Sequence, residues 1–261
     1  MVAVHRRRTA RDCAAFLLPY LRPGLDLLDI GCGPGSITLD LATHVAPGRV
    51  LGLDSAPTVV ESARAVAAER GDGSTRFAVG DLYALIEVPD ASYDVVFAHQ
   101  VLQHLSDPVA ALREMARVTR PGGLVAVRDA DFGTWAWHPA AEELTRWLGL
   151  YHDVARANGA EPDAGRRLPA WARAAGLTDV TVTTSTWSYH DPQARAVLAD
   201  GWARRTTESA FGERALELGF ADRVGLQAMA DAWRAWAAEP DGWFAMIHGE
   251  LIARAPRDRA P

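Results

Sequence analysis

A doubly wound α/β fold, built on a seven-stranded, mostly parallel sheet with a helical lid, is the fold class that this sequence predicts. Short apolar segments alternate with helical patterns along the first half of the chain, and this alternation is typical of a parallel sheet with helices on both faces. All 9 tryptophans lie beyond residue 132, which indicates that a different, mostly helical part is joined to the sheet.

The expected strands are short and mostly apolar. They cover residues 25–30, 49–53, 76–79, 93–97, 124–127, 178–189 and 243–253. Helices are expected over residues 9–21 and 36–45, from about Thr58, and after Asp107. Thr58 and Glu61 have the spacing of a capping box, and Asp107 stands before a proline as an N-cap residue often does. A mostly helical insertion is expected between the last two strands.

Composition excludes several classes of function. A formal net charge of −6 argues against a protein that binds nucleic-acid phosphates, although residues 5–8 form a local basic run. None of the 27 Lys and Arg residues is a lysine, so P-loop phosphate binding, Schiff-base chemistry and pyridoxal-phosphate catalysis are excluded. The Tyr-Lys pair of short-chain dehydrogenases is excluded for the same reason.

The sequence gives no sign of a membrane, a secretory route or a metal. No segment approaches the roughly 20 apolar residues that span a bilayer, and the N-terminus lacks the pattern of a secretory signal. Two cysteines, Cys13 and Cys32, cannot build a disulfide framework. The eight histidines show no metal-ligand spacing, and we therefore expect a cytoplasmic protein without a metal.

Acidic residues and glycines follow the first three predicted strands. The first strand leads into Asp29-Ile30-Gly31-Cys32-Gly33-Pro34-Gly35, the second ends at Asp54, and the third leads to Gly80-Asp81-Leu82. Ligands of open parallel sheets bind beyond the carboxyl ends of the strands. Glycines let the backbone approach such a ligand, and the helix that follows offers free N–H groups.

Two ligand classes compete for this edge of the sheet. Dinucleotide dehydrogenases use a G-x-G-x-x-G loop for a pyrophosphate, whereas Gly31, Gly33 and Gly35 give G-x-G-x-G and Ser36 replaces the last glycine of that pattern. Asp29 before the loop suits a ligand with an ammonium group better than a pyrophosphate. Asp81 also favours the second class, a nucleoside with a positively charged tail.

These motifs resemble class I S-adenosylmethionine-dependent methyltransferases, and the subgroup is similar to the small-molecule methyltransferases of ubiquinone and menaquinone biosynthesis. Residues 27–35 look like motif I of that family. The later motifs follow in order: Gly52-Leu53-Asp54, Val79-Gly80-Asp81-Leu82, Tyr93-Asp94-Val95-Val96, Gln100-Val101-Leu102-Gln103-His104-Leu105 with Asp107-Pro108, and Arg120-Pro121-Gly122-Gly123. The resemblance is tight over residues 25–130 and loose over the last two strands.

The resemblance implies a Rossmann-like core and three parts of the chain. Residues 1–24 would form an N-terminal helical arm, and residues 25–133 the core that binds S-adenosylmethionine. Residues 134–261 would supply the lid helices, the last two strands and an inserted helical substrate cap.

The resemblance also implies the cofactor-binding residues. Residues 29–35 would hold the methionine end, Asp54 the ribose, and Asp81 and Leu82 the adenine. The full expected set is Asp29, Gly31, Cys32, Gly33, Gly35, Asp54, Ser55, Gly80, Asp81, Leu82, Ala98 and His99.

Methyl transfer needs alignment and exclusion of water, and a base only where the acceptor must lose a proton. His99 is the first choice for that catalytic role, because it ends the fourth strand beside the expected methyl group. His104, Asp129, Asp131 and His138 are further candidates, each with an alternative structural role. The expected substrate contacts are Arg8, His104, Trp135, His138 and Trp202.

The sequence therefore predicts transfer of a methyl group from S-adenosylmethionine to a small, apolar or aromatic metabolite by in-line displacement. S-adenosylhomocysteine would be the product, and nucleic acid and membranes would not be partners. Two alternatives stay open, an NAD(P)-dependent oxidoreductase and a catalytically silent module that binds S-adenosylmethionine. The acceptor, the methylated atom and the oligomeric state, a homodimer included, also stay open.

Overall fold

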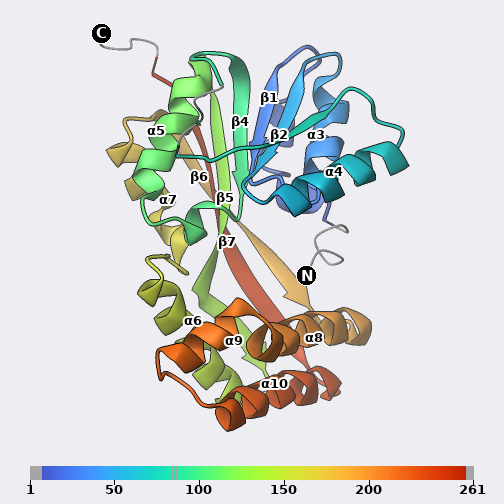
Figure 1. The fold of residues 1–261 in the computed structure, drawn as a ribbon, viewed down its shortest axis with the longest axis vertical. Helices are drawn as coiled ribbons and strands as arrows, with labels where there is room; N and C mark the ends of the chain where they lie inside the picture. The colour runs from blue at the N-terminus through green and yellow to red at the C-terminus, as the bar shows by residue number, and fades with distance from the viewer. Residues whose placement is uncertain (1–7, 84, 86–87, 257–261) are drawn as a thin grey trace.

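The computed structural model describes residues 8–83, 85 and 88–256, and in these ranges the strands form one seven-stranded sheet (Figure 1). The strands are β1 (Leu27–Ile30), β2 (Val50–Asp54), β3 (Arg76–Val79), β4 (Tyr93–His99), β5 (Thr119–His138), β6 (Thr178–Tyr189) and β7 (Trp243–Arg254). Their order is β3-β2-β1-β4-β5-β7-β6, with β7 antiparallel to both neighbours and the other pairs parallel. The expected α/β sheet of seven mostly parallel strands is thus confirmed.

The centre of the sheet is apolar because helices cover it on both sides. Leu28 and Val96 pair across β1 and β4, and both are fully buried. Burying a side chain of this size contributes about 1.5–3 kcal/mol, so these strands read as continuous apolar runs. One face packs against α5 (Pro108–Val118) and α7 (Ala164–Ala174), and the other against α3 (Ser36–Val45) and the N-terminal segment. Alongside α3, α4 (Pro57–Glu69) covers the β2 and β3 side.

The N-terminal segment is less helical than expected. Thr9 caps α2 (Ala10–Cys13), its hydroxyl accepting from the N–H of Asp12, but the α-helix ends there. After a turn the chain makes only the short 3-10 helix η1 (Leu18–Tyr20). Pro19 lies inside the expected helix, and proline removes a helical N–H and disfavours helical geometry in the residue before it. The prediction of one helix over residues 9–21 is therefore wrong.

Two predicted helix starts have different outcomes. Helix α5 begins as expected, because the Asp107 side chain accepts from the N–H of Ala110 and Pro108 takes the first position. The expected capping box at Thr58 and Glu61 is wrong. Helix α4 instead begins at Pro57, with Ala56 as its N-cap residue. Proline is favoured at the first helical position, where its missing N–H costs nothing.

Strands β5, β6 and β7 extend beyond the core sheet and carry a second, helical layer (Figure 1). This layer contains α6 (Glu142–Ala157), α8 (Pro192–Glu208), α9 (Ala210–Glu217) and α10 (Arg223–Ala238). Its core is strongly aromatic, and Trp147 and Trp233 are fully buried with ring centres 5.2 Å apart. The boundary expected after residue 133 falls inside β5, which spans both parts and shifts its register against β7 between Asp131 and Ala136.

None of the described helices is long and apolar enough to cross a membrane.

Candidate active site

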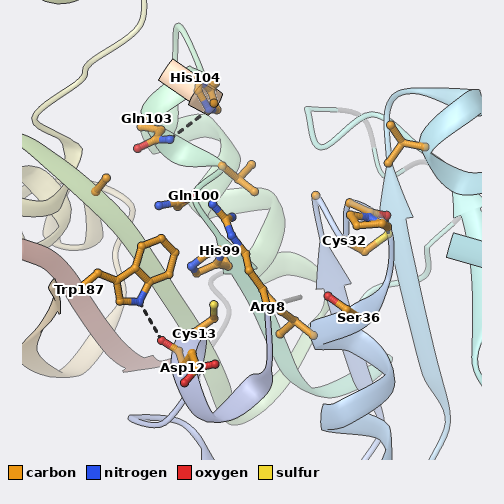
Figure 2. A pocket seen from close by; sticks show the side chains of 18 of the residues that line it. Arg8, Asp12, Cys13, Cys32, Ser36, His99, Gln100, Gln103, His104 and Trp187 are labelled. Atoms are coloured by element: carbon orange, nitrogen blue, oxygen red, sulfur yellow. Dashed lines mark hydrogen bonds between the residues drawn. The ribbon is translucent and has the colours of Figure 1, made fainter. Parts of the chain in front are cut away.

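A cavity of about 1820 Å³ opens at the carboxyl ends of β1, β2 and β4, and Figure 2 shows part of its lining. The lining continues over β5, β7 and β6 to helix α8. Sites for one small ligand usually measure about 300–1,000 Å³. The cavity is therefore large enough for two molecules side by side. Its walls differ in chemistry, with carboxylates at the β1–β3 end and aromatic rings at the α8 end.

The glycine loop after β1 forms part of the wall at the carboxylate end. Gly31, Gly33 and Gly35 have φ angles of +67°, +55° and +80°, which L side chains rarely adopt. A Cβ at Gly31 would overlap the side chain of Val101, and one at Gly35 would come within 2.8 Å of the Phe77 ring. A Cβ at Gly33 would meet nothing within 4 Å. Packing thus requires the outer two glycines, and the middle one borders the cavity, where a ligand can approach the backbone.

Asp29 is a buried carboxylate in this wall of the cavity. The residue is 2% exposed, and its carboxylate accepts a 2.6 Å hydrogen bond from Thr38. Burial raises the pKa of Asp29; the Thr38 hydroxyl opposes this shift and the nearby Asp54 adds to it, and the resulting pKa is about 7. A cation bound beside Asp29 would favour its ionised form.

Asp54 and Asp81 continue the wall along β2 and β3. The Asp54 carboxylate accepts from the N–H of Gly33 at 3.1 Å and from that of Ala56 at 3.0 Å, so it ties the glycine loop to the start of α4. Asp81 accepts from the N–H of Tyr83 at 2.9 Å. Three carboxylates at successive strand ends fit a nucleoside with a cationic tail, and a pyrophosphate would be repelled.

Most of the expected cofactor residues lie on the cavity wall. The lining set contains Asp29, Gly31, Cys32, Gly33, Asp54, Ser55, Gly80, Asp81, Leu82 and His99. Gly35 and Ala98 lie behind the wall, Gly35 as the N-cap residue of α3 and Ala98 fully buried in the core.

His99 takes part in a buried polar network with Arg128 of β5. Arg128 is fully buried and donates a 2.8 Å hydrogen bond to Nε2 of His99. Its other nitrogens reach Ser185 at 3.0 and 3.1 Å and Glu250 at 3.3 Å. Because a guanidinium only donates, Nε2 of His99 must be an acceptor, and the proton of the neutral ring lies on Nδ1.

Arg8 and Trp187 line the cavity close to Asp12 and Cys13 of the N-terminal segment (Figure 2). The guanidinium carbons of Arg8 and Arg128 lie 5.1 and 4.8 Å from the centre of the Trp187 ring. The Trp187 indole donates to the backbone oxygen of Asp12. Arg8 was expected at the site and lies there, whereas Trp187 was missed. Alternate residues of a strand point to the same face, so Trp187 shares a face with Ser185, and both line the cavity.

Gln100 is a second missed residue. It follows β4 in a left-handed backbone conformation, with φ of +55°, and lines the cavity beside His99. Its side-chain amide lies 3.0 Å from Nε2 of His248 on β7. Strained residues that are not glycine cluster at functional sites, but this strain cannot be read from the sequence.

The far end of the cavity is an aromatic compartment. It is formed by Phe132 and Trp135 of β5, Tyr151 of α6, and Trp202 of α8. Phe132 stacks on Trp135 and on Tyr151 with ring centres 4.3 and 4.2 Å apart. Phe132, Trp135 and Tyr151 are buried against one another, so the compartment has an apolar aromatic wall.

The other expected substrate contacts divide between the cavity and the surface. His104 of η2 (Leu102–His104) lines the cavity and lies 3.1 Å from the Gln103 amide. His138 is exposed at the end of β5, outside the cavity lining, and its backbone oxygen accepts from Trp236. The structure therefore separates His138 from the other expected substrate residues.

Known methyltransferases resemble this chain in sequence. A family model described as a methyltransferase domain matches residues 28–127. An uncharacterized methyltransferase of Schizosaccharomyces pombe is 32% identical over 258 residues, which cover 95% of this chain and 91% of that protein. A demethylmenaquinone methyltransferase of Lactococcus lactis is 35% identical over 122 residues, 46% of this chain and 48% of its own.

Solved structures agree on the fold. Phosphoethanolamine N-methyltransferase 2 of Haemonchus contortus, crystallised with S-adenosyl-L-methionine, aligns with a TM-score of 0.59 and 19% identity. The alignment covers 93% of this chain and 52% of that one. Sequence match, fold and the carboxylate-lined strand ends agree, and the chain therefore belongs to the S-adenosylmethionine-dependent methyltransferases, with S-adenosylmethionine as its cofactor.

Proposed function

We propose that this methyltransferase acts on a small, apolar or aromatic metabolite. One observation carries the proposal: a single cavity joins the wall of three carboxylates to the compartment of Phe132, Trp135, Tyr151 and Trp202. A flat apolar acceptor fits the second part, because ring faces favour stacked and edge-to-face partners. The relative named for demethylmenaquinone is compatible with such an acceptor.

The carboxylate end is proposed to hold the cofactor. Asp54 would accept from the ribose hydroxyls, Asp81 from the adenine amino group, and Leu82 would cover the ring. Asp29 would face the ammonium group of the methionine end, and the backbone of Gly31 to Gly33 would follow it. When bound, the cofactor supplies an electrophilic methyl carbon that the acceptor atom attacks in line.

The protein's own contribution is then alignment and exclusion of water. Arg8 and Trp187 cover the cavity from the N-terminal side, and α8 covers it from the other. We include Arg8 in the proposal as a contact to a carboxylate at the junction of the two parts. Its guanidinium lines the cavity and stacks on Trp187.

His99 is proposed to position groups at the end of β4 and not to remove a proton through Nε2. That nitrogen already accepts from Arg128, whose guanidinium stays protonated. His99→Ala should therefore lower kcat more than it weakens binding of S-adenosylhomocysteine, and the pH profile of kcat should keep its shape. Steady-state kinetics and calorimetry measure the two effects. Loss of an ascending limb near the imidazole pKa would show that His99 is a base, and equal loss of turnover and affinity would make it a binding residue.

The function is tested by incubating the purified protein with S-adenosylmethionine and a panel of planar hydroxy, amino and carboxy compounds. We expect formation of S-adenosylhomocysteine that depends on an acceptor, together with a methylated product in the mass spectrum. Aliphatic acceptors of the same size serve as the matched comparison. Turnover restricted to polar aliphatic acceptors would contradict the apolar or aromatic assignment, and failure to bind S-adenosylhomocysteine would contradict the proposed cofactor site.

A further inference from the structure

We propose that the acceptor is an organic acid whose carboxylate is bound by Arg8 at the junction of the two parts of the cavity. This inference rests on the proposed function and narrows its substrate class. It also assigns the carboxylate that Arg8 contacts to the acceptor and not to the methionine end of the cofactor. Arg8 precedes α2 and lines the cavity.

Arg8 lies on the acceptor side of the sheet. Its side chain extends from the N-terminal segment towards His99 and Gln100 (Figure 2). The guanidinium carbon lies 5.1 Å from the centre of the Trp187 ring. That ring lies 6.1 Å from the ring of His99 on β4 and 4.4 Å from that of His248 on β7. Trp187 thus brings Arg8 to the part of the cavity formed by β6 and β7, which β4 and β5 separate from β1 and its glycine loop.

Arg8 is a partly buried cation that has no ion pair with a carboxylate in the described parts of the chain. Burial lowers its pKa, and the side chains of Cys13 and Tyr189 act on it. Both are neutral at pH 7, because burial raises the pKa of Cys13 to about 11 and that of Tyr189 above its usual value. Asp12 is exposed and accepts from the Thr9 hydroxyl at 2.7 Å. Since removing a cation from water without a counter-charge is costly, an anion beside Arg8 would be stabilised.

The other cation on the Trp187 ring already has its counter-charge. The guanidinium carbon of Arg128 lies 4.8 Å from the ring centre, and Arg128 pairs with Glu250 at 3.3 Å. Burial, together with the charges of Arg128 and Arg8, lowers the pKa of His248 to about 2, so this imidazole is neutral at pH 7. Two guanidiniums therefore lie on one indole ring, and of the two only Arg128 has a carboxylate partner among the described residues.

The distribution of charge favours the acceptor as the source of the carboxylate. The methionine end of the cofactor is proposed to lie beside Asp29 and the glycine loop, and its carboxylate can accept there from the first N–H groups of α3, which have no partner within the helix. Arg8 then remains for the acceptor. A carboxylate on Arg8 would gain charge-assisted hydrogen bonds and face the sulfonium of the cofactor, whereas a cationic acceptor would meet a like charge on both sides.

Calorimetry on the protein saturated with S-adenosylhomocysteine tests the inference with two probes of nearly equal shape, 2-naphthoate and 2-naphthamide. We expect the wild type to bind 2-naphthoate at least about 10-fold more tightly, the scale of a charge-assisted hydrogen bond. Arg8→Gln should remove this preference and leave the affinity for 2-naphthamide within about 2-fold. Arg8→Lys should keep part of the preference, because the charge stays and the planar fork is lost.

Binding of S-adenosylhomocysteine by the Arg8→Gln protein distinguishes the two sources of a carboxylate. The affinity should stay within about 2-fold of the wild type, because Arg8 is assigned to the acceptor. A loss of about 10-fold or more would place the carboxylate of the cofactor on Arg8 and overturn the inference.

A matched control uses Arg11 of α2, which also borders the cavity but is exposed. Arg11→Gln removes the same charge from the same segment and should leave the preference for 2-naphthoate unchanged. Loss of the preference in this variant too, equal binding of the two probes by the wild type, equal weakening of both by Arg8→Gln, or no binding of 2-naphthoate would each overturn the inference. Absence of S-adenosylhomocysteine binding by the wild type would instead contradict the proposed function, so the two failures are distinguishable.

Discussion

Asp54→Ala is expected to weaken binding of S-adenosylhomocysteine by about 1–3 kcal/mol, a factor of roughly 5 to 150. Losing charge-assisted hydrogen bonds to the proposed ribose hydroxyls accounts for this range. The same carboxylate also accepts from the N–H groups of Gly33 and Ala56, so its removal loosens the glycine loop that borders the cofactor. Both effects act in the same direction, and isothermal calorimetry measures their sum.

Two further variants test whether the charge of Asp54 and its place at the cavity account for the weaker binding. Asp54→Asn keeps the shape but not the charge, so it should fall between the wild type and the alanine variant. Asp90→Ala removes a mostly exposed carboxylate that pairs with Arg117, outside the cavity lining, and should leave the affinity unchanged. An Asp54→Ala protein that binds S-adenosylhomocysteine as tightly as the wild type would falsify the ribose assignment.

The core sheet could be predicted because its signals are local. The strand over residues 178–189 and the one over residues 76–79 match β6 and β3 at both ends. Mostly apolar runs buried on both faces, such as Leu27–Ile30, end where glycines begin. The same local order placed Asp29, Asp54 and Asp81 at one edge, because the carboxyl ends of parallel strands meet there.

The length of β5 could not be predicted in the same way. The run Arg128-Asp129-Ala130-Asp131 looks like the start of a loop, since buried charges need partners. Each charge has a partner from far along the chain: Arg128 has Glu250, and Asp131 accepts from Arg166 at 2.7 Å. Asp129 accepts from the N–H of Gln103. Such long-range partners are invisible to local patterns, so the strand was expected to stop at residue 127.

The acceptor side of the site was harder to predict than the cofactor side. Its members come from β5, β6, α6 and α8, and their meeting depends on the antiparallel register between β5, β7 and β6. Trp135 and Trp202 were expected there by residue type and lie there, whereas Trp187 was missed. His138 was expected there as a residue near a strand end, but β5 carries it past the cavity to the surface.

Arg128→Met is expected to lower the free energy of unfolding by about 3–5 kcal/mol, because it leaves a buried carboxylate without its cation. Glu250 keeps only 7% of its side chain exposed and pairs with Arg128 at 3.3 Å. The substitution also removes the donor to His99 and the cation that lies against Trp187. Chemical denaturation measures the loss, and the melting temperature should fall by roughly 2–4 °C for each kcal/mol.

The double variant Arg128→Met with Glu250→Met tests whether the missing cation is the cause. Removing both charges together leaves no unpaired ion, and replacing a buried ion pair by apolar side chains is often close to neutral. The double variant should therefore recover much of the stability that the single variant loses. If it is as unstable as Arg128→Met alone, the loss comes from the contacts of Arg128 with Ser185, His99 and Trp187, and the Glu250 pair contributes little.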